Sequence, residues 1–100
     1  MLSYDDVASS KDNLIRGKLF NQPSPKGEPG IDVYDGCKVS YREKKANVDN
    51  LLAVLKGDAQ AAGGGPVLKS NENSKIFLYY ADLGGAGVLN MAGGGHLYAD

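Results

Sequence analysis

The sequence predicts an α/β protein with an incomplete central sheet, mostly parallel, and flanking helices. Three segments carry this prediction: a short apolar segment at residues 1–4, an amphipathic helix at residues 47–56, and an apolar, aromatic segment at residues 75–80. A strand, a helix and a strand in this order favour a right-handed crossover between parallel strands. We therefore expect residues 1–4 to pair in parallel with residues 75–80.

Length and composition limit the chain to a single small globular domain at most. It has 100 residues, of which 42% are hydrophobic and 23% charged, as in ordinary globular proteins. A net charge of −1 gives no electrostatic reason to expect a nucleic-acid partner. No segment approaches the roughly 20 apolar residues of a membrane span, and no signal-peptide pattern follows Met1. The compartment is unknown from these features.

Residues 47–56 form the clearest predicted helix. Asn47 is a good N-cap, Asp49 lies in the first turn, where the helix dipole favours an anion, and Gly57 suits the position after the helix. Four apolar residues have the spacing of a buried stripe: Val48, Leu51, Leu52 and Leu55. Three polar residues are expected in solvent: Asp49, Asn50 and Lys56.

The segment before this helix gives weaker signals. Prolines and glycines between residues 16 and 41 indicate a turn-rich excursion, with short strands possible at residues 19–20 and 31–34. After the helix, residues 59–66 are small and Gly-rich and predict a flexible connection. They lack the Gly-Lys-Ser/Thr ending of a phosphate-binding loop.

The segment at residues 75–91 organises the rest of the chain. Its apolar first part runs into a turn with three glycines at residues 82–87, and a second apolar run follows at residues 88–91. A Gly-rich turn at a strand tip allows a ligand to approach the backbone, as at the carboxyl edge of open α/β sheets. A plain hairpin turn is the alternative interpretation, and residue types alone favour it.

The sequence YYADLGGAGVL at residues 79–89 resembles the Tyr-Tyr-Ser-Asp-His-Gly-Gly-Pro-Gly-Val-Leu signature of legumains, the asparaginyl endopeptidases. Further similarity occurs in the same order at residues 4–8, 32–36, 52–58 and 67–70. Residues 26–30 look like an insertion in a surface loop. The resemblance covers nearly the whole chain. It implies that residues 1–100 are a partial legumain-like peptidase domain, truncated at both ends, with a partial caspase-like fold.

The resemblance also implies a cysteine endopeptidase that cleaves peptide or protein substrates after Asn, without a cofactor or metal. In such enzymes a thiolate attacks the scissile carbonyl, a His transfers the proton, and backbone amides hold the oxyanion. The family's catalytic His position is Leu83 here, the Gly84 amide would be an oxyanion donor, and the nucleophilic Cys would follow Asp100. Leu cannot transfer a proton, so we expect the chain to be inactive. The resemblance to legumains also implies a lysosomal, vacuolar or secretory compartment.

Three further residues are candidates near such a site. Cys37, the only cysteine, cannot form an intrachain disulfide and is expected to be a small, half-buried side chain. His96 follows three glycines and is expected to be a solvated loop residue; replacing the missing base is its alternative role. Asp82 either orients groups at the site or caps the turn.

Three functional hypotheses remain open. The chain is a fragment of an active endopeptidase whose Leu83 is an allelic or sequencing change, or a genuine pseudoprotease that binds without catalysis. In the second case Ala86 for Pro and Asn90 for Gly are also relaxed positions. The third is a subunit like the transamidase that attaches lipid anchors, although residues 34–36 and 67–70 fit legumains better. We expect the remainder of the peptidase domain to be needed to complete the sheet, because half a sheet rarely folds alone.

Overall fold

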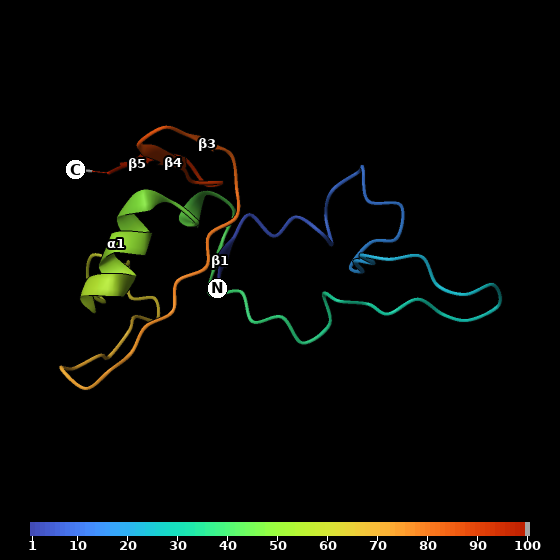
Figure 1. The fold of residues 1–100 in the computed structure, drawn as a ribbon, viewed down its shortest axis with the longest axis horizontal. Coiled ribbons are helices and arrows are strands. Elements are labelled where there is room, and N and C mark those ends of the chain that lie inside the picture. The colour runs from blue at the N-terminus through green and yellow to red at the C-terminus, as the bar shows by residue number, and fades with distance from the viewer. Residues whose placement is uncertain (100) are drawn as a thin grey trace. The chain divides into compact units, whose positions relative to one another are not determined.

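The computed structural model describes residues 1–99 as two compact units, one of residues 1–4 with those from residue 40 onward, the other of residues 5–39. Figure 1 shows the course of the chain. The elements in chain order are β1 (Leu2–Ser3), β2 (Tyr41–Arg42), the 3₁₀ helix η1 (Glu43–Lys45), α1 (Val48–Lys56), β3 (Gly84–Gly85), β4 (Val88–Asn90) and β5 (His96–Tyr98). Short sheets and an α-helix agree with a partial, mixed α/β domain.

The parallel pairing exists, but with a different partner from the one expected. β1 pairs with β2, with Leu2 opposite Tyr41 and Ser3 opposite Arg42. Residues 75–80 form no strand, so the predicted pairing of residues 1–4 with residues 75–80 is wrong. A strand is defined by hydrogen bonds to a neighbouring strand, and no backbone in the described part of the chain bonds to this segment.

The helix forms where the local signals place it. Asn47 Oδ1 accepts a hydrogen bond from the Asn50 amide at 2.9 Å, as expected of an N-cap. Gly57 follows the last helical residue with φ of 73°, a left-handed conformation that favours glycine, and its amide donates to the Val54 carbonyl at 3.2 Å. Both predicted ends of the helix are confirmed.

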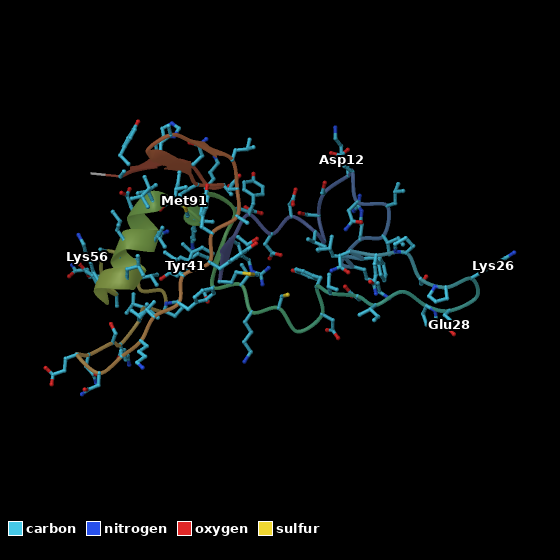
Figure 2. The ribbon with its side chains drawn as sticks, in the orientation of Figure 1. Asp12, Lys26, Glu28, Tyr41, Lys56 and Met91 are labelled. Carbon is cyan, nitrogen blue, oxygen red and sulfur yellow. The ribbon has the colours of Figure 1, made fainter. Side chains whose placement is uncertain are left out.

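A small core lies between α1 and β2. Tyr41, Ala53 and Ala62 are buried, and Leu2, Val54 and Val67 pack against them. The Tyr41 hydroxyl donates to the Pro66 carbonyl at 2.8 Å and so joins the Gly-rich connection to this core. The core residue Tyr41 is labelled in Figure 2.

The predicted stripe on α1 is only partly right. Leu51 is buried, whereas Val48, Leu52 and Leu55 are half-buried. Ala53, which lies outside the stripe, is buried because the helix turns this side toward Tyr41. Asp49 and Lys56 are exposed as expected, and Asn50 is half-buried.

Residues 5–39 contain turns but no helix or strand. The short strands considered at residues 19–20 and 31–34 are therefore wrong. The two segments meet instead through one backbone bond, from the Val33 amide to the Leu19 carbonyl at 2.8 Å, and through the side chain of Asp32. Residues 26–29 are exposed, and Lys26 and Glu28 mark this loop in Figure 2, as expected of a surface insertion.

Candidate functional site

The Gly-rich turn joins two strands of a three-stranded antiparallel sheet. Gly85 lies opposite Val88 and Gly84 opposite Leu89, and β5 pairs with the other edge of β4. The turn between β3 and β4 consists of Ala86 and Gly87, and Gly87 has φ of 73°, which a side chain disfavours. The hairpin interpretation of this stretch is confirmed.

Leu83 directly precedes this hairpin. Its backbone is hydrogen-bonded, and its side chain is exposed to solvent. Its amide donates to Asp82 Oδ1 at 2.7 Å, and its carbonyl accepts from the Asn90 amide at 3.2 Å. The side chain is 79% exposed. Asp82 thus acts as a turn residue, and a side chain at position 83 has room to reach a group outside the described chain.

The Tyr80 hydroxyl joins the two ends of the hairpin. Its oxygen lies 2.9 Å from the Leu83 carbonyl oxygen and 2.5 Å from that of Asn90. A tyrosine has one hydroxyl proton, so the two carbonyls share a single donor. We did not anticipate this contact from the sequence, because it depends on the hairpin bringing residues 83 and 90 together.

Gly84 has a backbone amide that faces away from its partner strand. In an antiparallel ladder, hydrogen-bonded and non-hydrogen-bonded pairs alternate. The Asn90 amide bonds to the Leu83 carbonyl, so the next pair, Gly84 with Leu89, falls at a non-hydrogen-bonded position. A Cβ atom at Gly84 would approach the Val88 carbonyl oxygen to 3.0 Å. The site therefore combines an outward amide with a position where a side chain is crowded.

His96 begins β5, so the expected loop was wrong, whereas its side chain is exposed to solvent as expected. It lies opposite Asn90, and its Nδ1 is 2.6 Å from Asn90 Oδ1. Side chains of directly opposed residues share one face of the sheet, which explains how these two meet. The Asn90 amide also donates to the carbonyl of Leu83, the residue before β3, so Asn90 links Leu83 on one side to His96 on the other. A catalytic role for His96 stays a prediction.

Cys37 belongs to the other unit, residues 5–39, and is exposed. Its Sγ lies 3.5 Å from the Val33 carbonyl oxygen, to which the thiol donates. The expectation of a half-buried side chain was wrong, because this unit contributes no buried apolar residue that could cover it.

The described residues hold neither a metal-binding cluster nor a helix suited to span a membrane. Within residues 1–99, no three His, Cys, Asp or Glu side chains gather closely enough to hold a metal ion. No helix in the same range has both the length and the apolar character needed to cross a bilayer.

The sequence of the whole chain matches a known family. The family model described as the Peptidase C13 family matches residues 1–100. The chain belongs to the peptidase C13 family. The resemblance to legumains is thereby confirmed, although Leu83 departs from the catalytic His of their signature.

Relatives within this family cover most of the chain. It is 44% identical over 86 residues to the hemoglobinase of Schistosoma japonicum, which covers 86% of this chain and 19% of that protein. It is 43% identical to the vacuolar-processing enzyme beta-isozyme of Arabidopsis thaliana, over 99% of this chain and 20% of the relative. It is 40% identical to the legumain of Homo sapiens, over 89% of this chain and 20% of the relative. The chain thus spans about a fifth of the length of these relatives.

Proposed function

We propose that this chain is part of a legumain-like cysteine endopeptidase domain with a caspase-like fold, and that it is catalytically inactive with Leu83. The domain would act on peptides or proteins and cleave after Asn. The observation that carries this proposal is the exposed side chain of Leu83 directly before Gly84 in the hairpin, at the place where the legumain signature has its catalytic His.

The inactivity follows from the chemistry of the missing base. A cysteine nucleophile needs a group that takes its proton and returns it to the leaving amine. The aliphatic side chain of Leu83 can do neither. By analogy with serine proteases, in which loss of the base lowers kcat by about 10⁶-fold, a nucleophile supplied elsewhere would not restore useful turnover.

The backbone conformation at Gly84 is consistent with a role in stabilising the oxyanion. An oxyanion is stabilised by amide donors that already point at the place where negative charge develops. The Gly84 amide faces away from β4 and is adjacent to position 83, which suits this role. The Tyr80 hydroxyl holds the carbonyls of Leu83 and Asn90 and would keep the amide in place.

A pseudoprotease is the second candidate. The contact between His96 Nδ1 and Asn90 Oδ1 favours it, because it gives position 90 a side-chain partner that the glycine of the legumain signature could not provide. A binding module would keep the scaffold while its active-site positions acquire such new contacts. Restoring His at position 83 would then leave the protein inactive.

A chimera separates the two candidates. Residues of this chain would replace the matched region of Homo sapiens legumain, which is 40% identical over 92 residues. We expect no cleavage of a fluorogenic peptide after Asn with Leu83, and cleavage after Leu83→His. Leu83→Gln is the matched control, since it is polar but transfers no proton. Cleavage with Leu83 would contradict the proposed inactivity, and a folded but inactive Leu83→His chimera would favour the binding module.

A further inference from the structure

The chain between α1 and β3 contains a long exposed segment. Every residue from 68 to 79 is exposed, and Figure 1 shows this connection extending away from both elements to a tip. The Leu68 amide donates to the Val54 carbonyl at 3.1 Å and anchors the start of the segment. Within residues 69–81, all of which are described, the only bond between backbone groups runs from the Ser74 amide to the Asn71 carbonyl, at 3.0 Å. The tip is therefore a turn held only by its own residues.

Local bonds close this turn of residues 71–74. Asn71 Oδ1 accepts from the Asn73 amide at 2.9 Å and from the Ser74 hydroxyl at 3.4 Å. The Asn71 amide donates to Ser74 Oγ at 3.0 Å. These bonds are exposed, and a bond of this kind contributes only about 1 kcal/mol. The turn can therefore open locally without disturbing the core around Tyr41.

The side chains of Asn71 and Asn73 differ in their contacts. The carboxamide of Asn71 is engaged in the turn, whereas that of Asn73 makes no hydrogen bond to any of residues 1–99. A carboxamide has two N–H donors and an oxygen acceptor, and a pocket that recognises asparagine must reach both kinds of group. Asn73 offers them without first breaking a bond.

The other asparagines of the chain are less suited to recognition. Four of them already use their side chains in hydrogen bonds: Asn13, Asn47, Asn50 and Asn90. Asn21 is exposed, but the Val33 amide donates to the carbonyl of nearby Leu19 at 2.8 Å and restrains this part of the chain. Pro23 also follows closely, and proline lacks the amide with which an extended peptide pairs in a binding cleft.

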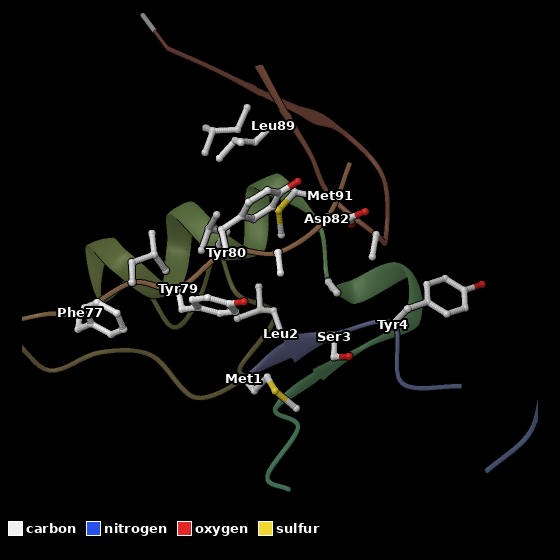
Figure 3. A pocket seen from close by; sticks show the side chains of 16 residues that line it. Met1, Leu2, Ser3, Tyr4, Phe77, Tyr79, Tyr80, Asp82, Leu89 and Met91 are labelled. Atoms are coloured by element: carbon white, nitrogen blue, oxygen red, sulfur yellow. The ribbon is translucent and has the colours of Figure 1, made fainter. Parts of the chain in front are cut away.

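The turn is polar, whereas the segment after it is apolar. Residues 71–75 are Asn, Glu, Asn, Ser and Lys. Phe77 to Asp82, together with Met1 to Tyr4, line a pocket of about 590 Å³ that the turn does not line (Figure 3). A further segment of the domain would be attracted to this apolar surface rather than to the turn. Exposed loop tips with small, polar residues are the preferred sites of proteolytic cleavage.

We propose that the peptide bond between Asn73 and Ser74 is a cleavage site for an asparagine-specific endopeptidase. The enzyme's nucleophile would attack the Asn73 carbonyl carbon, the bond to the Ser74 nitrogen would break as that nitrogen takes a proton, and water would then release the Asn73 carboxylate. The cut divides the chain between α1 and Leu83. The proposal rests on the proposed function only through the specificity for Asn, and the protease in its test is supplied from outside.

The substrate in the test is the chimera with Homo sapiens legumain that carries Leu83, after its cooperative unfolding has been confirmed. It is treated with a catalytic amount of active Homo sapiens legumain, and the products are followed by mass spectrometry and N-terminal sequencing. We expect the first new N-terminus within the grafted residues to begin Ser-Lys-Ile-Phe, the sequence of residues 74–77. A fluorogenic peptide cleaved after Asn confirms that the added protease is active.

Two variants test the assignment to Asn73. Asn73→Gln should slow this cleavage at least about tenfold, because one extra methylene displaces the carboxamide in a pocket fitted to Asn. Asn71→Gln is the matched control and should be cleaved after Asn73 at least as fast as the unaltered chimera, because it disturbs the turn that must open. An unchanged rate in Asn73→Gln would overturn the proposal, as would a first cut after Asn71 or Asn21.

Two further outcomes would also overturn it. One is an intact graft while the fluorogenic peptide is cleaved. The other is a cut after Asn73 that occurs only at temperatures where the chimera unfolds, since the site would then be closed in the folded protein. Failure of the proposed inactivity is seen separately, because a chimera active with Leu83 would cleave the fluorogenic peptide before any protease is added. The comparison of Asn73→Gln with Asn71→Gln would still decide the cleavage site in that case.

Discussion

The hydroxyl oxygen of Tyr80 lies 2.5 Å from the carbonyl oxygen of Asn90 and 2.9 Å from that of Leu83. One side chain thus closes the base of the hairpin that follows Leu83, the position proposed to have lost its catalytic base. The contact joins the end of an unpaired extended segment to a paired sheet. It would fix where any side chain at position 83 begins.

Tyr80→Phe should loosen this hairpin. The substitution removes the donor and leaves one or both carbonyls without it, at a cost of about 1 kcal/mol. In the chimera with Homo sapiens legumain, we expect a lower free energy of unfolding and faster exchange of the Asn90 amide. Tyr79→Phe is the control, because Tyr79 is 78% exposed. Equal effects of the two changes would contradict a specific role for the Tyr80 hydroxyl.

Gly93→Ala should destabilise the connection between β4 and β5. A Cβ atom at position 93 would lie 2.5 Å from the Glu43 carbonyl oxygen and 2.8 Å from that of Ala46. Backbone atoms cannot rotate away as a side chain can, so we expect a loss of about 1–3 kcal/mol in the free energy of unfolding of the chimera. At Gly85 a Cβ atom would meet only Val88 Cγ1 at 3.5 Å. Gly85→Ala is therefore the control, and a loss as large as that of Gly93→Ala would refute the steric explanation.

Asn47→Ala should weaken α1 from its first turn. The change removes the acceptor of the Asn50 amide, whose bond to Asn47 Oδ1 is 2.9 Å long, and N-cap losses cost about 1 kcal/mol. Urea unfolding of the chimera measures the effect. Asn47→Asp keeps an oxygen acceptor at the N-cap and should retain most of the stability. If both variants lose the same amount, capping does not explain the role of Asn47.

Asp32 should make the stability of the unit of residues 5–39 fall at acid pH. The Leu19 amide, 3.0 Å from its Oδ1, lowers the pKa of this carboxyl below the ordinary value of 3.8, with further help from the Tyr34 amide and Lys18. A lowered pKa means that the carboxylate's contribution is fully present above 3.8 and is lost as pH falls through the lower, folded value. The amide chemical shift of Leu19, followed by NMR against pH, should titrate below 3.8. A midpoint at or above 3.8, or the same titration in Asp32→Asn, would contradict this.

The parts of the fold that depend on neighbours along the chain were predictable. Asn47 and Gly57 define the ends of α1 through bonds within a few residues. The glycine at position 87 indicates a tight turn, because its positive φ is available to glycine at little cost. These signals act locally, so a single sequence contains them.

The parts that depend on distant partners were not predictable. β2 has two residues and exists only because β1 lies beside it. Residues 75–80 have the apolar, aromatic composition of a strand but find no partner among the described residues, and propensity without pairing makes no strand. Local glycines suggested a loop around His96, yet pairing with Asn90 makes it part of β5.

At the candidate site, the sequence indicated which residues matter but not which side chains hold them in place. Leu83 and Gly84 follow from the resemblance to legumains. The hydrogen bond from the Tyr80 hydroxyl to the Leu83 carbonyl and the contact between His96 and Asn90 form only when the hairpin brings residues from different strands together. Side-chain contacts of this kind have no spacing rule along the chain.

With Leu83 at position 83, the proposed legumain-like site lacks its catalytic base. The most direct test of this proposal compares kcat for cleavage after Asn between the chimera with Leu83 and the same chimera with Leu83→His. We expect activity only after the substitution, with a difference approaching about 10⁶-fold. Turnover by the Leu83 chimera within tenfold of the substituted one would contradict the claim and move the search for the base to another residue, His96 first.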